Sequence, residues 1–133
     1  MRRTLELVMT ANAALFFFGA VQHAGIAIGP LHEPSIIPAT IVETLCGVSL
    51  LCGAASVWLH SRIEWRVALI ANLFALSGVF LGIAALAAGA GPRTASNDFY
   101  HGIMLLLIGV SLTLMVIGRS GLRRRGNSAA KGS

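Results

Sequence analysis

The side chains best suited to chemistry in this sequence are two residues that interrupt long apolar runs, His23 and Glu43, and one that begins such a run, His101. Imidazole and carboxylate groups can relay protons, hydrogen-bond a polar head group or hold a metal ion. An ionisable group inside a long apolar segment is costly to bury and therefore marks a candidate functional position. We take His23, Glu43 and His101 as the candidate ligand-binding residues.

The apolar runs that carry these residues are long enough to cross a membrane as helices. Of the 133 residues, 56% are hydrophobic and 11% are charged, whereas a soluble domain has roughly a quarter charged residues. A helix rises about 1.5 Å per residue and the hydrocarbon core is about 30 Å thick. We therefore expect four spans, near Leu5–Ile28, Ile36–Leu59, Val67–Ala88 and Phe99–Ile117.

The connections between these spans are short, so neighbouring spans should pack side by side in opposite directions. The fold predicted for residues 1–118 is an all-α integral membrane four-helix bundle with up-down-up-down topology. The remaining residues, 119–133, form a basic tail that contains several Gly and Ser residues. We expect this tail to be disordered and to lie against anionic headgroups.

The distribution of basic residues predicts the orientation. Nine of the ten Lys and Arg residues lie before the first span, between the second and third spans, or after the fourth; Arg93 is the exception. By the positive-inside rule, both termini should be cytoplasmic, as in a multi-pass protein of a cell inner (plasma) membrane. This asymmetry also accounts for the net charge of +5 without a nucleic-acid partner, and the bilayer is the expected partner.

In this orientation, the three candidate residues lie toward the extracytoplasmic side, below the outer-loop residues His32, Glu33, Asn97 and Asp98. Glu43 lies about 9 Å along the second span from its outer end, and His23 lies at nearly the same depth in the first. Helical spacing places Glu43 and His23 on polar or small stripes that should face the bundle interior. The sequence therefore predicts a His23–Glu43 contact, with His101 as a third member if the fourth span packs beside the second.

Three interpretations of this polar group stay open. The His23–Glu43 pair could be interhelical glue, part of a pocket for a small ligand or redox partner, or, with His101, part of a metal site. The metal interpretation is the least favoured, because no His-x-x-x-His or Glu-x-x-His spacing occurs. No phosphate-binding loop, nucleophile elbow or dinucleotide fingerprint is present either. The residues therefore assign no catalytic group, reaction or cofactor.

Two pairs of glycines at GxxxG spacing predict close helix packing. Gly25 and Gly29 form one pair, and Gly78 and Gly82 form the other. Small residues at this spacing let a neighbouring backbone approach closely in lipid. The neighbour could be a helix of the same chain or, in a homo-oligomer, of a second copy.

The order of features in the first two spans resembles the DoxX-like superfamily of small four-helix bacterial membrane proteins. The first span ends in Phe18-Gly19-Ala20-Val21-Gln22-His23, a proline-containing loop follows, and the second opens with Val42-Glu43-Thr44-Leu45-Cys46-Gly47. The resemblance covers about half of the chain and carries over Glu43 and, less directly, His23. Typical members have a basic residue where this chain has His23, and Tyr100-His101 has no counterpart in the family pattern.

Family members are linked to membrane redox partnerships, including thiosulfate–quinone chemistry. The resemblance therefore implies a four-helix fold and a membrane redox partner. Together with the polar group, it leads us to expect a small-ligand-binding protein or an accessory subunit of a membrane redox system, with a polar pocket near the outer face. The alternatives are a small proton-coupled transporter, for which the second-span Glu43 would carry the proton, and a purely structural membrane subunit.

Overall fold

The computed structural model describes residues 1–28, 34–91 and 94–131, with side chains described up to residue 118. It contains four helices: α1 (Arg2–His23), α2 (Ile37–Trp58), α3 (Glu64–Ala87) and α4 (Ala95–Lys131). Each has a stretch long and apolar enough to cross a membrane; in α4 this stretch is Ala95–Gly118. The expected all-α fold with four candidate spans is confirmed, and it indicates a multi-pass membrane protein.

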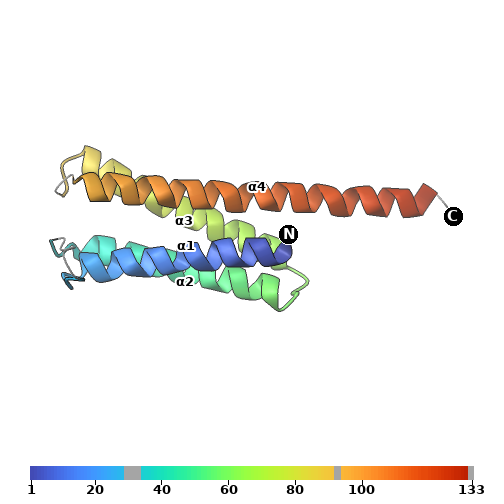
Figure 1. The fold of residues 1–133 in the computed structure, drawn as a ribbon, viewed down its shortest axis with the longest axis horizontal. Coiled ribbons are helices and arrows are strands. Elements are labelled where there is room, and N and C mark those ends of the chain that lie inside the picture. Colours follow the sequence, from blue (N-terminus) through green and yellow to red (C-terminus); the bar gives the residue numbers. More distant parts are fainter. Residues whose placement is uncertain (29–33, 92–93, 132–133) are drawn as a thin grey trace.

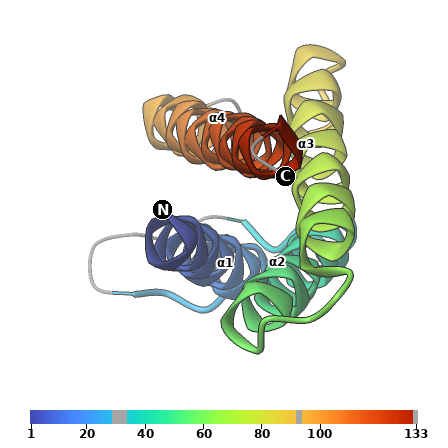
Figure 2. The ribbon, with the colours of Figure 1, turned by 90° about the vertical axis from the view of Figure 1, so that its right-hand side faces the viewer.

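The four helices surround a common core (Figures 1 and 2). Helix α2 packs along α1 and α3, and α4 packs along α1 and α3 less extensively. Among the described residues, the two diagonal pairs, α1 with α3 and α2 with α4, make no close backbone contact. The end of α1, the start of α2, the end of α3 and the start of α4 lie together, and we call this end of the bundle the cavity end (Figure 1).

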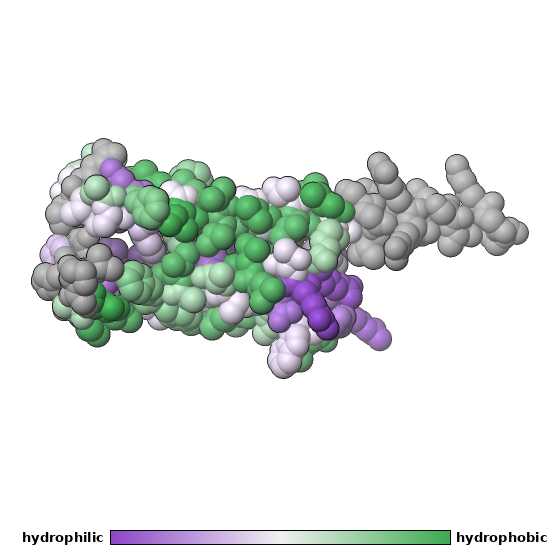
Figure 3. All heavy atoms as spheres, viewed as in Figure 1, coloured by the Kyte–Doolittle hydropathy of each residue, from purple (hydrophilic) through white to green (hydrophobic). Residues whose placement is uncertain are grey.

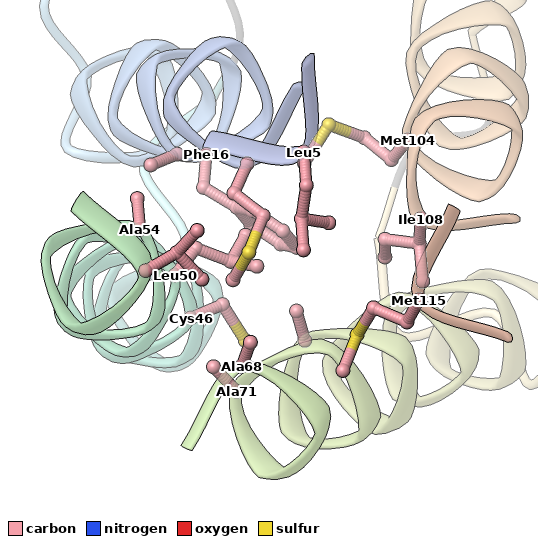
Figure 4. Close-up of a cluster of buried hydrophobic side chains, with 14 of the residues drawn as sticks. Leu5, Phe16, Cys46, Leu50, Ala54, Ala68, Ala71, Met104, Ile108 and Met115 are labelled. Carbon is pink, nitrogen blue, oxygen red and sulfur yellow. The ribbon is translucent and has the colours of Figure 1, made fainter. Parts of the chain in front are cut away.

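The core-facing residues recur at alternating steps of three and four. In α1 they are Leu5, Met9, Asn12, Phe16, Gly19 and His23, and in α4 they are Asn97, His101, Met104, Ile108, Ser111, Met115 and Gly118. Such a 3.5-residue period keeps one seam of each helix directed at its neighbours over the whole length. Figure 4 shows how the apolar members of these seams meet side chains of α2 and α3.

Small residues allow α1, α2 and α3 to pack closely. A Cβ atom added at Gly53 of α2 would lie 3.0 Å from Cβ of Ala71 and 3.4 Å from Cα of Ala68, both in α3. One added at Gly47 would lie 3.0 Å from the ring of Phe17 in α1. In lipid, where helices gain little from hydrophobic burial against one another, this close van der Waals contact is a main source of association.

Large apolar side chains cover the outside of the bundle. Exposed examples occur on every helix and include Leu7, Ile41, Ile70, Phe80 and Leu106. In the view of Figure 3, a hydrophobic surface covers the sides of the bundle, and hydrophilic residues gather toward its ends. This is the surface expected of helices whose outer faces contact lipid rather than water.

Helix α1 ends five residues before the expected Ile28, because a glycine-based motif stops it after His23. Gly25 has φ +83°, which places it in the left-handed region that favours glycine. The Gly25 amide donates to Gln22 O at 2.9 Å, and the Ile26 amide donates to Val21 O at 3.3 Å. This is a Schellman motif, which satisfies carbonyls that a helix end would otherwise leave unpaired.

Helix α4 begins four residues earlier and ends later than the predicted fourth span. At its start, the Asn97 amide donates to Thr94 Oγ1 at 3.2 Å, so Thr94 serves as the capping residue. At its other end, the helix continues through the predicted tail to Lys131. The tail, expected to be disordered, is thus helical in the structure up to Lys131; no proline interrupts it, so each added residue can extend the ladder of backbone hydrogen bonds.

The two glycine pairs differ in their positions. Gly25 lies beyond the end of α1 rather than on a helix face, and Gly29 lies outside the described residues. Gly78 and Gly82 of α3 face Cys46 of α2 and His101 of α4, respectively. The second pair therefore packs within the chain, and a homo-oligomer stays a prediction that these contacts do not test.

The opposite end of the bundle contains a buried acidic residue. Arg2 of α1 and Glu64, the first residue of α3, form an ion pair of 2.7 Å between Nη2 and Oε1. The Glu64 side chain is 5% exposed, whereas that of Arg2 is 45% exposed. The pair therefore joins the start of α1 to the start of α3 at the end of the bundle away from the cavity.

The Schellman motif makes a stability prediction. Replacing Gly25 with alanine forces a Cβ atom into the left-handed region and should cost about 1–2 kcal/mol of folding free energy. The control is Gly102→Ala, because Gly102 lies in the α4 helix and an added Cβ there meets nothing within 4 Å. Thermal unfolding in detergent should show a lower midpoint for Gly25→Ala and an unchanged or higher one for Gly102→Ala. Equal midpoints for both variants would contradict the assignment of the motif.

Candidate functional site

His23 and Glu43 meet at the cavity end, as predicted. His23 is the last residue of α1, and Glu43 lies in the second turn of α2. The His23 Nδ1 atom lies 2.8 Å from Glu43 Oε2, and each residue is 7% exposed. The backbone holds the two helix ends together, because the Ile36 amide donates to the His23 carbonyl at 2.8 Å. The hydrogen-bonded pair is therefore buried and anchored from both helices.

Tyr100 of α4 engages the second oxygen of the same carboxylate. Its hydroxyl and Glu43 Oε1 converge over Gly19, where an added Cβ atom would lie 2.7 Å from Oε1 and even closer to the hydroxyl. Tyr100 forms a side-chain hydrogen bond with Glu43. The Tyr100 hydroxyl also lies 3.3 Å from the Leu15 carbonyl. A phenol has only one proton to donate. Because a carboxylate is a stronger acceptor than a backbone carbonyl, we assign this proton to the bond with Glu43. Both oxygens of Glu43 are thus held by side chains from other helices.

His101 reaches the site from α4 and is held by its own helix. The His101 Nδ1 atom lies 2.8 Å from the Asn97 carbonyl oxygen, one turn earlier. A carbonyl oxygen can only accept, so Nδ1 carries the proton in this bond. The ring lies against α3, where an added Cβ atom at Gly82 would be 2.5 Å from His101 Nε2. Gly82 therefore allows the imidazole to lie where it does.

These residues line a partly open cavity of about 210 Å³. Its polar lining residues are His23, Glu43, Asn97, Tyr100 and His101. The rest of the wall is apolar or small and comes from Phe16, Ile36, Pro38, Ala39, Val42, Gly78, Val79, Leu81, Gly82, Ala85, Leu86, Ala90 and Gly91. Such a mostly apolar cavity with a few convergent polar groups is typical of small-molecule sites.

The structure brings all three predicted residues to this cavity, although not by the expected packing. His101 was expected to join if the fourth span packed beside the second, but α4 packs beside α1 and α3. His101 instead reaches the cavity from the helix diagonal to that of Glu43. Of the expected outer-loop residues, Asn97 lines the cavity, whereas His32 and Glu33 lie outside the described residues. That these residues bind a ligand stays a prediction.

Sequence reasoning missed the role of Tyr100, which it did not include among the candidate residues. A signal was available in Gly19, because a glycine on the polar stripe of the first span indicates that another group approaches there. To predict that Tyr100 pairs with Glu43, one still needs the relative heights of α2 and α4 along the bundle. The sequence pattern alone does not supply them.

The metal interpretation gains no support from the geometry. Within the described part of the chain, no group of three or more His, Cys, Asp and Glu residues is arranged to hold a metal ion. Among the polar residues at the cavity, one imidazole nitrogen of His101 and both oxygens of Glu43 already have protein partners. The arrangement is better suited to hydrogen bonding at one end of an apolar ligand.

Comparisons of this chain with protein-family models, curated proteins and solved structures found no match. The resemblance to the DoxX-like superfamily therefore stays an expectation from the sequence.

The buried pair predicts non-additive mutational effects. Removing one member by His23→Leu or Glu43→Leu leaves the other as an uncompensated buried group, which should cost about 3 kcal/mol or more. Removing both members should cost less than the sum of the single changes. Unfolding free energies of the wild type, both single variants and the double variant measure this coupling. Additive losses would show that the contact contributes nothing to folding.

Proposed function

We propose that this chain is a membrane protein that binds a small, largely apolar molecule in the cavity that residues of all four helices line. The observation that carries the proposal is the distribution of polarity around the cavity. Five polar residues, His23, Glu43, Asn97, Tyr100 and His101, line the cavity, and the remaining wall is apolar or made of small residues. A ligand with an apolar body and one polar group would match both parts.

The cavity also favours ligand binding over a purely structural role, in which the His23–Glu43 pair only holds the helices together. A purely structural role needs only the His23–Glu43 contact, with the surrounding side chains packed against it. Here the pair instead borders an open space, and a second imidazole, His101, lines the same space. Polar groups that line a cavity within the membrane carry a free-energy cost. A ligand that pairs with these groups would offset that cost.

In the proposed membrane arrangement, the four spans run up-down-up-down in an inner (plasma) membrane, with both termini cytoplasmic and the cavity in the outer leaflet. The basic residues at the start of α1 and between α2 and α3 support this orientation. The DoxX-like pattern around His23 and Glu43 supports a place beside a membrane redox system. The role proposed there is that of an accessory ligand-binding subunit.

The ligand proposal predicts a difference in what is purified with the protein. Wild type extracted in mild detergent should carry a small organic molecule that a His23→Ala, Glu43→Gln double variant has lost. The control is Thr44→Val, because Thr44 is adjacent to Glu43 but exposed, with its hydroxyl bonded to Thr40 O at 2.7 Å. Mass spectrometry of the extracted ligand, with visible absorbance and metal content, compares the three proteins.

Equal ligand content in all three samples would remove the support for a binding site at this cavity. The transporter alternative has a separate outcome. Proton-coupled transport in reconstituted vesicles that is lost in Glu43→Gln would favour an exporter instead. The structure makes this less favourable, because both oxygens of Glu43 are already paired within the protein.

The orientation has its own test. A fluorescent protein that matures only in the cytoplasm should fluoresce when it is fused to either terminus. A cysteine introduced at Ala90, near the cavity, should react with a membrane-impermeant thiol reagent added outside intact cells, once Cys46 and Cys52 are replaced by alanine. Labelling from the cytoplasmic side only would reverse the proposed orientation and leave the binding cavity itself unaffected.

A further inference from the structure

His101 lines the cavity and has one ring nitrogen that no described residue pairs with. Its Nδ1 proton is used by the Asn97 carbonyl, so in the neutral imidazole the lone pair lies on Nε2. Within the described residues, Nε2 has no hydrogen-bond partner, although His101 is only 9% exposed and lines the cavity. An acceptor without a partner is costly in an apolar setting. The cavity therefore offers a hydrogen-bond position that a ligand can fill.

The charged group at the cavity offers no comparable position. Glu43 Oε2 is 2.8 Å from His23 Nδ1, and Oε1 faces the Tyr100 hydroxyl. A cationic ligand would have to compete with these partners for the carboxylate. An anionic ligand would bring its charge beside Glu43 in a medium where repulsion is weakly screened. Neither kind of charge suits this site.

We propose that the ligand is an uncharged molecule with a hydroxyl group that donates to His101 Nε2, carried on a compact apolar ring. This rests on the function proposed above and specifies the ligand class. The cavity of about 210 Å³ is smaller than the roughly 300–1,000 Å³ of drug-sized sites. It exceeds the cavity of about 150 Å³ that admits benzene. One ring with a short substituent fits these limits, and Asn97 lines the same wall and can hydrogen-bond the hydroxyl oxygen.

Three probes of matched size separate the chemistry. 4-Ethylphenol carries the donor, 4-ethyltoluene replaces its hydroxyl with a methyl group, and 4-methylbenzylammonium carries a positive charge. Affinity is measured for each probe with the full-length protein in detergent, and each value is compared with that of His101→Phe, so that partitioning of the probe into detergent cancels. Phenylalanine keeps a ring at the position but removes the acceptor. Thr113→Val on the exposed face of α4 is the control.

The expected result is that His101→Phe weakens 4-ethylphenol binding about tenfold or more, whereas 4-ethyltoluene binding is unchanged and Thr113→Val affects neither probe. Equal losses for both probes, or tighter binding of the ammonium probe than of the phenol in wild type, would overturn the hydroxyl-donor proposal while the binding cavity stands. Failure of all three probes to bind would count against the binding function itself.

A measurement on the wild type decides the case if His101→Phe does not fold. Nitrogen NMR of labelled histidine should show a shift of one Nε2 resonance when 4-ethylphenol is added, because a new hydrogen bond forms there. The same resonance should not move with 4-ethyltoluene. No change with the phenol at saturation would overturn the proposal.

Discussion

Inside a bilayer, a charged or polar side chain is costly to bury unless it finds a partner within the protein, and this constraint shapes the cavity end of the bundle. The clearest case is Glu43, which sits on a helix that is apolar on nearly every side. Its two oxygens are held by His23 of α1 and Tyr100 of α4. One carboxylate therefore joins three of the four helices, including a pair, α2 and α4, that makes no close backbone contact.

The same constraint gives the glycines at the cavity end their importance. Gly19 leaves room for the Tyr100 hydroxyl beside the carboxylate, and Gly82 leaves room for the His101 ring beside α3. The polar cluster thus depends on the absence of a Cβ atom at Gly19 and Gly82 as much as on its own side chains. The weaker packing of α4 against α1 and α3 leaves space next to this cluster. A cavity results from such packing, and polar contacts of Tyr100 and His101 help to hold α4 where apolar contacts are fewer.

Much of the fold and part of the site could be predicted from the sequence. Lengths and composition predicted the four helices, and the polar stripe through His23 together with the depth of Glu43 predicted their contact. Helix ends were predicted less well. The end of α1 depends on the backbone conformation of Gly25, and the start of α4 depends on a hydrogen bond to Thr94. Both helix ends are set by local backbone conformation and hydrogen bonding, which an uninterrupted apolar pattern does not reveal.

The sequence by itself determined that the chain has four apolar helices and that ionisable residues lie near one end, because hydropathy and helical period are properties of single segments. Only the tertiary structure decided that His101 reaches the site from the diagonal corner, that Tyr100 binds Glu43, and that a cavity lies between them. These features depend on the relative heights and rotations of helices far apart in the chain. Such helices are positioned by small residues and pairwise contacts, which a pattern within one helix cannot specify.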